Sequence, residues 1–343
     1  MKEILFQFGL NSDRFSVLPF GNGLINSTWV IEDAPGKPAY ILQKINQGVF
    51  KHPEDIALNT RMIGDYLQLN FPAYNYVASR KTIDGNDLFK TVDGYYRVFP
   101  FVPGSHTVDV VEKPQQAYEA ARQFGRFTKK LSVFDVSQLK ITLPGFHDLS
   151  LRYREFESAL RSGNRERVAE SSGLIATVIQ HKTIVDEFEI YRSVLTARVT
   201  HHDTKISNVL FDNHDNGICV IDLDTVMPGY FISDVGDMMR TYLCPVSEEE
   251  KDFSKITIRS AFYDAIVNGY LSEMRAVLSE QELTYFHFAG KFMIYMQAIR
   301  FLTDHINDDV YYGAKYEGHN LVRAGNQLTL LQRLQEFNNE LSV

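Results

Sequence analysis

The stretch that decides the fold of this chain is His201-His202-Asp203-Thr204-Lys205-Ile206-Ser207-Asn208. The apolar run Val209-Leu210-Phe211 follows it, and after a polar turn the chain continues as Cys219-Val220-Ile221-Asp222-Leu223-Asp224. The pattern is H-x-D-x-x-x-x-N followed by a strand that ends in an acid. We expect residues 208–211 and 217–222 to form a hairpin, which would bring Asn208 and Asp222 to the same end of the two strands.

This spacing is typical of the active site of kinase-fold phosphotransferases, and each polar position suits phosphoryl transfer. Asp203 can orient an attacking hydroxyl and accept its proton, so we predict that it is the catalytic base and contacts the substrate. Asn208 and Asp222 offer the oxygen ligands that Mg²⁺ prefers. A capped polar turn is the alternative, but the strand and second acid favour the catalytic interpretation. Asp224 can face metal or substrate or support its neighbours, and we place it with the substrate residues.

Composition limits the class of protein. The chain has 343 residues, 44% hydrophobic and 23% charged, which is typical of a globular protein with about two domains. With 35 basic and 43 acidic residues its net charge is −8, so we expect binding neither to nucleic acid nor to membranes. The sequence shows no long apolar segment and no signal peptide, and we expect a cytoplasmic protein. Cys219 and Cys244 are expected to be reduced.

The first hundred residues predict a small sheet with one helix. The helix begins near Pro53 and covers residues 53–69, with Glu54 and Asp55 in its first turn. Pro103-Gly104 closes the last strand, so we place a nucleotide-binding lobe at 1–102 and a catalytic and substrate-binding lobe at 103–343. The segments rich in β-branched and aromatic residues, which predict strands, are 16–20, 27–32, 40–45 and 95–102.

The second lobe is predicted to be mainly helical, apart from strands within 209–226. The expected fold is therefore α+β, bilobal and protein-kinase-like, with an N-terminal antiparallel β-sheet lobe carrying one helix and a larger, mainly helical C-terminal lobe. The segments with helical patterns are 115–132, 150–162, 166–196, 253–278, 279–305 and 320–341. Ser279 and Glu282 fit a capping box.

A glycine turn in the first lobe is a candidate for nucleotide binding. Gly21-Asn22-Gly23, together with Asn26 and Thr28, can lay backbone amides over phosphates, although an ordinary hairpin turn explains the same residues equally well. Lys44 lies late in the next strand, where a kinase-like lobe places its phosphate-contacting lysine. A solvated lysine is the alternative. Its acidic partner is expected on the 53–69 helix, with Glu54 and Asp55 as candidates.

A polar group near the C-terminus is a candidate for substrate binding. Arg300 and Asp304 are four residues apart and so share one helix face. Sequence physics leaves a surface ion pair and a patch that grips substrate hydroxyls equally open. Tyr312 follows in a loop that can line the same pocket. His201, in contrast, is expected to brace the loop backbone.

These residues resemble the aminoglycoside phosphotransferase and choline kinase superfamily, and within it the N-acetylhexosamine 1-kinases. The catalytic loop His202–Asn208 and the segment Ile221–Gly229 are similar to theirs. The other blocks that carry the resemblance are Tyr40–Asn46, Val49–Glu54, Asp234–Arg240, Arg300–His305 and Gly318–Ala324. Leu24 and Ser27 depart from the histidine and aspartate expected in the glycine turn.

The resemblance implies phosphorylation of the anomeric (C1) hydroxyl of N-acetylglucosamine or N-acetylgalactosamine, with ATP as donor and Mg²⁺ as cofactor. It makes Asp203 the base, Asn208 and Asp222 the metal ligands, Lys44 a phosphate contact, and Arg300 and Asp304 sugar contacts. The expected partners are the sugar and ATP, with the chain a monomer or homodimer. The alternatives are a related kinase acting on another sugar or an amino alcohol, and a nucleotide-binding pseudokinase.

Overall fold

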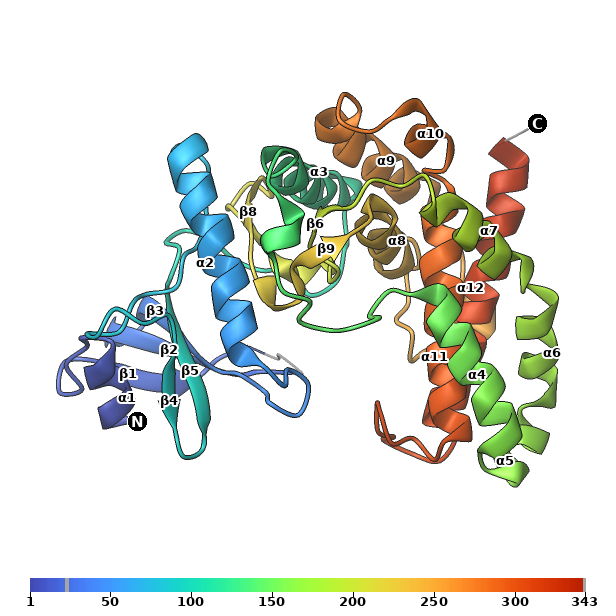
Figure 1. Ribbon diagram of the computed structural model, residues 1–343, viewed down its shortest axis with the longest axis horizontal. Coiled ribbons are helices and arrows are strands. Elements are labelled where there is room, and N and C mark those ends of the chain that lie inside the picture. The colour runs from blue at the N-terminus through green and yellow to red at the C-terminus, as the bar shows by residue number, and fades with distance from the viewer. Residues whose placement is uncertain (22–24, 342–343) are drawn as a thin grey trace.

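The computed structural model describes residues 1–21 and 25–341, and its N-terminal lobe is an antiparallel sheet with the strand order β1-β2-β3-β5-β4 (Figure 1). The strands are β1 (Ser16–Pro19), β2 (Ser27–Ala34), β3 (Lys37–Lys44), β4 (Phe89–Thr91) and β5 (Gly94–Pro100). The predicted helix is α2 (Pro53–Asn70), and a short helix that the sequence did not predict, α1 (Lys2–Gln7), precedes the sheet.

The two faces of this sheet have different neighbours. Side chains alternate between the faces of a strand, and Ile31, Leu42 and Val98 pack with Ile4 and Leu5 of α1 in a small core of their own. On the other face the register places Thr28 opposite Gln43, and Gln43 opposite Arg97. This second row is polar and faces the rest of the molecule.

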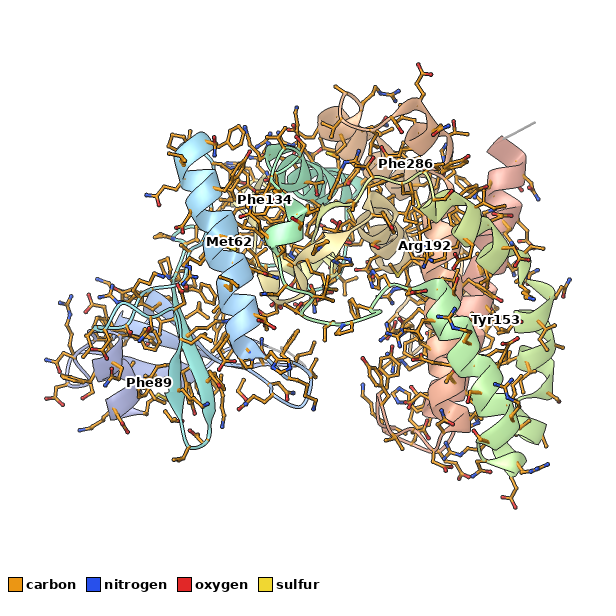
Figure 2. All side chains as sticks on the ribbon, viewed as in Figure 1. Met62, Phe89, Phe134, Tyr153, Arg192 and Phe286 are labelled. Carbon is orange, nitrogen blue, oxygen red and sulfur yellow. The ribbon has the colours of Figure 1, made fainter. Side chains whose placement is uncertain are left out.

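Helix α2 connects the sheet to the larger lobe. Its Ile63 and Leu67 belong to the large C-terminal core, and Tyr66 packs edge-on against Phe134 with ring centroids 5.3 Å apart. Figure 2 labels Met62 on α2 and Phe134 on the neighbouring segment of the larger lobe. The buried Asn59 donates to the carbonyl oxygens of Lys140 (2.8 Å) and Val226 (3.0 Å). These contacts fix α2 against the segment that follows the catalytic loop.

The C-terminal lobe is mainly helical around one large core (Figure 1). Most of α11 is buried at its centre, between α4 on one side and α8 and α12 on the others. Short strands carry the catalytic segment: β6 (Arg198–Thr200), β7 (Val209–Phe211), β8 (Gly217–Val220) and β9 (Met227–Gly229). The helices are α3 (Pro114–Lys130), α4 (Leu149–Ser162), α5 (Arg165–Glu170), α6 (Ser172–Gln180), α7 (Thr183–Arg192), α8 (Phe231–Tyr242), α9 (Ser260–Met274), α10 (Glu280–Thr284), α11 (Phe288–Ile306) and α12 (His319–Leu341).

Several predicted helix boundaries were wrong. The segment 166–196 forms α5, α6 and α7 rather than one helix, and the chain turns at Ser171, whose hydroxyl donates to the carbonyl of Arg167. The segment 279–305 divides into α10 and α11 because the chain turns at the buried Phe286. Helix α8 was missed, although its polar residues Ser233, Asp234, Asp237 and Arg240 share one face, and nearly all of it is buried. The Ser279–Glu282 capping box was confirmed.

The structure also bears on the predictions about membrane spans, cysteines and the lobe boundary. Within residues 1–21 and 25–341, no helix is long and apolar enough to cross a lipid bilayer. Cys219 is buried in β8, Cys244 is partly buried, and both are free thiols. The predicted lobe boundary after residue 102 follows directly on β5, and it stays a prediction.

Candidate active site

The β7–β8 hairpin brings together the residues predicted to bind metal. Val209 pairs with Val220, and the amide of Ile221 donates to the carbonyl of Asn208 at 2.9 Å. Asn208 and Asp222 therefore lie at the same end of the hairpin. The predicted hairpin is confirmed, while the metal-binding role of its two residues stays a prediction.

Two buried acids of α8, Asp234 and Asp237, hold the backbone of the candidate catalytic loop. The carboxylate of Asp234 accepts the amides of His201 (3.1 Å) and His202 (2.8 Å), and Asp237 accepts the amide of Thr204 at 2.8 Å. Burial raises the pKa of Asp234 to about 7, against the lowering effect of these two amides. The sequence block Asp234-x-Gly-Asp237 therefore fixes the loop backbone on both sides of Asp203.

His201 and His202 support the loop from within the core. The Nε2 atom of His201 lies 3.0 Å from the carbonyl oxygen of Ile221, next to Asp222, which fits the expected bracing role. His202 has a left-handed backbone (φ 67°), and its ring occupies space that exists only because residue 229 is glycine. A Cβ on Gly229 would lie 2.3 Å from the Nε2 of His202. Burial lowers the pKa of both histidines, that of His202 to about 4, so both are neutral near pH 7.

Asp203 lies at the surface of this braced loop. A quarter of its side chain is exposed, and its Oδ2 forms an ion pair with Nζ of Lys205 at 3.0 Å. Burial alone would lower the pKa of Lys205, but Asp203, Asp222 and Asp237 outweigh it and raise that pKa. Asn208 donates from Nδ2 to the carbonyl of Asp203 at 2.8 Å, which leaves its Oδ1 without a donor among the described residues. The loop thus presents the carboxylate of Asp203, the ammonium of Lys205 paired with it, and the side-chain amide oxygen of Asn208.

Asp222 has the chemistry of a metal ligand. Its backbone is left-handed (φ 58°), and its carboxylate forms no hydrogen bond or ion pair with the described residues. Burial, followed by the carboxylates of Asp224 and Asp203, raises the pKa of Asp222 to about 7, against the effect of Arg97 and Lys205. A divalent cation would reverse this shift, and Mg²⁺ at nucleotide sites takes only one or two protein carboxylates.

This donor set therefore fits the predicted Mg²⁺, with Asn208 and Asp222 as its protein ligands. Within residues 1–21 and 25–341, no group of three or more His, Cys, Asp or Glu side chains is arranged to hold a metal ion by itself.

Asp224 connects the two lobes. Nη1 of Arg97 lies 2.5 Å from Oδ1 of Asp224, and Nδ2 of Asn26 donates to its Oδ2 at 2.7 Å. The pair is buried, with side chains 5% and 3% exposed for Arg97 and Asp224. Both oxygens of Asp224 therefore have protein partners from the N-terminal lobe, and its predicted substrate contact stays a prediction.

Lys44 lies on the opposite face of the sheet from Arg97. Its Nζ forms an ion pair with Asp93 at 3.2 Å and lies 5.8 Å from the ring centre of Tyr96. The expectation that Lys44 pairs with Glu54 or Asp55 of α2 is wrong, because the alternation of β3 directs its side chain away from α2. Glu54 instead accepts a hydrogen bond from Tyr95. A phosphate contact by Lys44 stays a prediction.

The glycine turn is only partly described. Asn22 and Gly23 lie outside the described residues, whereas Gly21 has a positive φ of 73° with no atom near its Cβ position. Phe20, Gly21, Asn26 and Thr28 line an open cavity of about 320 Å³. The predicted contacts of these residues with nucleotide stay predictions.

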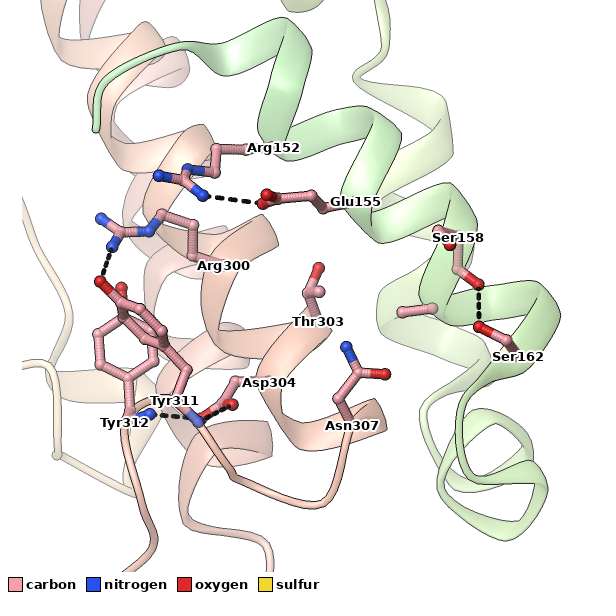
Figure 3. A pocket seen from close by; sticks show the side chains of 11 residues that line it. Arg152, Glu155, Ser158, Ser162, Arg300, Thr303, Asp304, Asn307, Tyr311 and Tyr312 are labelled. Carbon is pink, nitrogen blue, oxygen red and sulfur yellow. Dashed lines mark hydrogen bonds and ion pairs between the residues drawn. The ribbon is translucent and has the colours of Figure 1, made fainter. Parts of the chain in front are cut away.

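A second cavity, of about 460 Å³, lies between α4 and α11 (Figure 3). Arg300, Asp304 and Tyr312, the predicted substrate residues, all line it, together with Arg152 and Tyr311. Arg152 is paired with Glu155 at 2.9 Å, whereas Arg300 contacts only neutral oxygens, those of Gln297 and Tyr311, both at 3.3 Å. No carboxylate among the described residues forms an ion pair with Arg300.

Asp304 does not pair with Arg300 but holds the loop that follows α11 and lines this cavity. Its carboxylate accepts the amides of Tyr311 (2.7 Å) and Tyr312 (2.9 Å) and the side-chain amide of Asn320 (3.1 Å). The surface ion pair considered from the sequence is therefore absent from this part of the structure. Asp304 holds the loop after α11 so that the two tyrosines face Arg300, as Figure 3 shows.

Aromatic side chains connect the cavity to the catalytic loop. Phe146 lies under the guanidinium of Arg300, 5.3 Å from ring centre to Cζ, and stacks on His147 at 4.4 Å. The ring of His147 is 5.2 Å from that of His202, the residue before Asp203. Ring contacts therefore run from Arg300, which lines the cavity, to the residue before the candidate base. Phe146 and His147 were missed from the sequence because they lie in an irregular segment without a periodic pattern.

The bilobal fold, the braced H-x-D-x-x-x-x-N loop and the acid hairpin define a kinase-fold phosphotransferase. The chain belongs to the phosphotransferase enzyme family, whose model matches residues 16–279. Its superfamily is that of the aminoglycoside phosphotransferases and choline kinases, as predicted, and it is a small-molecule phosphotransferase.

Solved structures of low sequence identity share the fold along almost the whole chain. An aminoglycoside phosphotransferase from Alicyclobacillus acidocaldarius has a TM-score of 0.60 at 13% identity, covering 99% of this chain and 96% of that chain. A microcompartment-associated aminopropanol kinase has a TM-score of 0.65 at 14% identity, covering 98% and 97%. A choline kinase from Cryptosporidium parvum has a TM-score of 0.57 at 12% identity, covering 97% and 92%. The predicted kinase-like fold is confirmed.

Proposed function

We propose that this phosphotransferase transfers the γ-phosphoryl group of ATP to the anomeric (C1) hydroxyl of an N-acetylhexosamine, N-acetylglucosamine or N-acetylgalactosamine. The sequence blocks around Asp203, Asp222 and Arg300 support this acceptor through their resemblance to N-acetylhexosamine 1-kinases. ATP as donor is supported by family membership and by the solved spectinomycin phosphotransferase of the same fold, which was crystallised with ADP.

The observation that carries the proposal is the unpaired guanidinium of Arg300 in the cavity between α4 and α11. Arg300 faces this cavity, and no acidic side chain among the described residues pairs with it. The carboxylate of Asp304 instead accepts hydrogen bonds from the backbone amides of Tyr311 and Tyr312. The guanidinium of Arg300, which has no carboxylate paired with it, disfavours the cationic ammonium of choline, ethanolamine or an aminoglycoside beside it. The cavity suits a neutral sugar, because Arg300 can donate to hydroxyl or acetamide oxygens and Tyr311, Tyr312 and Phe146 offer apolar faces.

The transfer is a direct in-line displacement. The C1 oxygen forms a bond to the γ-phosphorus, the bond from that phosphorus to the β–γ bridging oxygen breaks, and ADP leaves with the electron pair. The carboxylate of Asp203 orients the sugar hydroxyl and accepts its proton. Lys205, held 3.0 Å from Asp203, keeps its positive charge beside the reacting group. Asn208 and Asp222 would hold Mg²⁺, whose charge neutralises the donor phosphates when it is bound.

A panel of acceptors tests the proposal. ADP release is measured with ATP, Mg²⁺ and, separately, N-acetylglucosamine, N-acetylgalactosamine, glucose, choline, ethanolamine, aminopropanol and an aminoglycoside. We expect the most rapid release with the N-acetylhexosamines, no release with the amine acceptors, and a kcat/KM for glucose that is lower by about tenfold or more, because the acetamide contact is lost. Turnover with an amino alcohol and none with any sugar would overturn the proposal. ATP binding without turnover of any acceptor would favour the pseudokinase.

A further inference from the structure

We propose that Arg97 of β5 is the cation of the N-terminal lobe that contacts the donor phosphates, in the place that a strand lysine has in other kinase folds. This inference rests on the proposed nucleotide donor but not on the identity of the acceptor. It differs from the sequence-based expectation, which gave this contact to Lys44.

The register of the sheet separates the two cations. In a kinase-like lobe the lysine of the third strand points into the cleft. Gln43 is the β3 residue that does so here: it lies opposite Thr28 and Arg97, and its Nε2 is 3.4 Å from the Thr28 hydroxyl. Lys44 is one residue further, so it projects from the other face, against Asp93 and Tyr96.

Arg97 supplies the charge that Gln43 lacks. Its Nε and Nη2 donate to Oε1 of Gln43 at 3.0 and 2.8 Å, and its Nη1 meets Asp224 at 2.5 Å. These contacts fix the guanidinium plane. The hydrogen bonds to Gln43 use two of the five N–H donors of Arg97, and the contact with Asp224 is an ion pair. N–H donors therefore remain on both terminal nitrogens without a hydrogen-bond acceptor among the described residues. A pair of parallel donors is suited to a phosphate.

The surroundings of Arg97 are those expected for the phosphates. Asn26, which follows the glycine turn, donates to the same Asp224 carboxylate at 2.7 Å. Asp222, two residues before, is the candidate metal ligand. Asn26 and the guanidinium of Arg97 therefore meet at Asp224, two residues after the candidate metal ligand, at the junction of the lobes. Within the described residues, no other lysine or arginine of β1–β5 contacts the segment 201–224.

The test measures binding of ATP, ADP and adenosine to the full chain with Mg²⁺, by calorimetric titration without any acceptor. We expect Arg97→Met to weaken ATP about tenfold or more and adenosine less than about twofold, because only the phosphates lose a charged contact. Adding Gln43→Lys to Arg97→Met, which returns a lysine to the cleft face, should recover part of the ATP affinity. Lys90→Met, at the sheet edge beside Tyr95, serves as the control for removal of a strand cation.

Two results would overturn the inference. Equal weakening of adenosine and ATP by Arg97→Met would assign Arg97 a purely structural role, and a phosphate-selective loss with Lys44→Met would return the contact to β3. If Arg97→Met does not fold, Arg97→Lys keeps the charge without the paired donors and should still lose affinity selectively for ATP over adenosine. Nucleotide binding that follows this pattern without turnover of any sugar would contradict the proposed acceptor and leave the role of Arg97 intact.

Discussion

Asp203 and Lys205 form an ion pair of 3.0 Å on a loop that buried acids of α8 fix from behind. The partly exposed carboxylate is therefore held in place before any acceptor arrives. Asp203→Asn keeps the shape but cannot accept the proton, so we expect kcat to fall by about 10² to 10⁴. ATP affinity, measured by titration, should change little. Full turnover by Asp203→Asn would contradict the assignment of the base.

Gly229 and His202 are matched in shape, because a Cβ at position 229 would lie 2.3 Å from the imidazole. We expect Gly229→Ala to displace the ring, to lower stability by about 1–3 kcal/mol and to reduce kcat by shifting the loop before Asp203. Gly173→Ala in α6 is the matched control, since nothing lies within 4 Å of its Cβ position, and it should leave kcat unchanged. Both variants can be compared by urea unfolding. Equal behaviour of the two would contradict the shape argument.

His202 also gives stability a defined pH dependence. Its folded-state pKa is lowered to about 4 by burial, below the unfolded value of about 6.5, so between these values only the unfolded chain binds the proton. The contribution of His202 is present above pH 6.5 and is lost as pH falls toward 4. We expect a loss of about 2 kcal/mol from pH 7 to pH 5 that is missing in His202→Asn, whose asparagine tolerates the left-handed backbone.

The matched control is His214→Asn, which removes an exposed imidazole from the β7–β8 turn. It should unfold with the same pH dependence as the wild type. If His202→Asn kept the full wild-type dependence, the buried neutral state of His202 would be ruled out.

The cavity beside α11 depends on Asp304. Asparagine at this position offers one carbonyl oxygen in place of the two that accept the amides of Tyr311 and Tyr312. We expect Asp304→Asn to loosen the loop and raise the KM for the acceptor by about tenfold, with the KM for ATP unchanged. Arg300→Met should likewise raise the KM for the acceptor and leave the KM for ATP unchanged. A rise in the KM for ATP instead would indicate that this cavity binds the donor nucleotide and not the acceptor.

Local patterns explain which parts of the site were predictable. The H-x-D-x-x-x-x-N loop and the hairpin to Asp222 are encoded within about 25 contiguous residues, where spacing and turn chemistry fix the geometry. Arg97 was not predictable in this way, because its position depends on which strand lies beside β3 and in what register. Gln43 and Lys44 show the consequence: neighbouring residues of one strand lie on opposite faces of the sheet.

Buried elements were the other source of error. Helix α8 was not predicted as a helix, although Asp234, Asp237 and Arg240 recur at helical spacing and the two acids were recognised as part of a motif. The shared helix face of Asp304 and Arg300 left an ion pair between them open, but backbone amides seven and eight residues further along the chain take up the Asp304 carboxylate. Loop closures of this kind leave no periodic signal in the sequence.

The most direct test of the central claim is the position of the phosphate in the product. The full chain is incubated with ATP, Mg²⁺ and N-acetylglucosamine or N-acetylgalactosamine, and the product is examined by phosphorus–proton correlation NMR. We expect phosphorus coupled to the anomeric proton at C1, and far less of this product from Asp203→Asn in the same time. Phosphorus coupled to protons at another carbon, or no sugar phosphate at all, would contradict an N-acetylhexosamine 1-kinase.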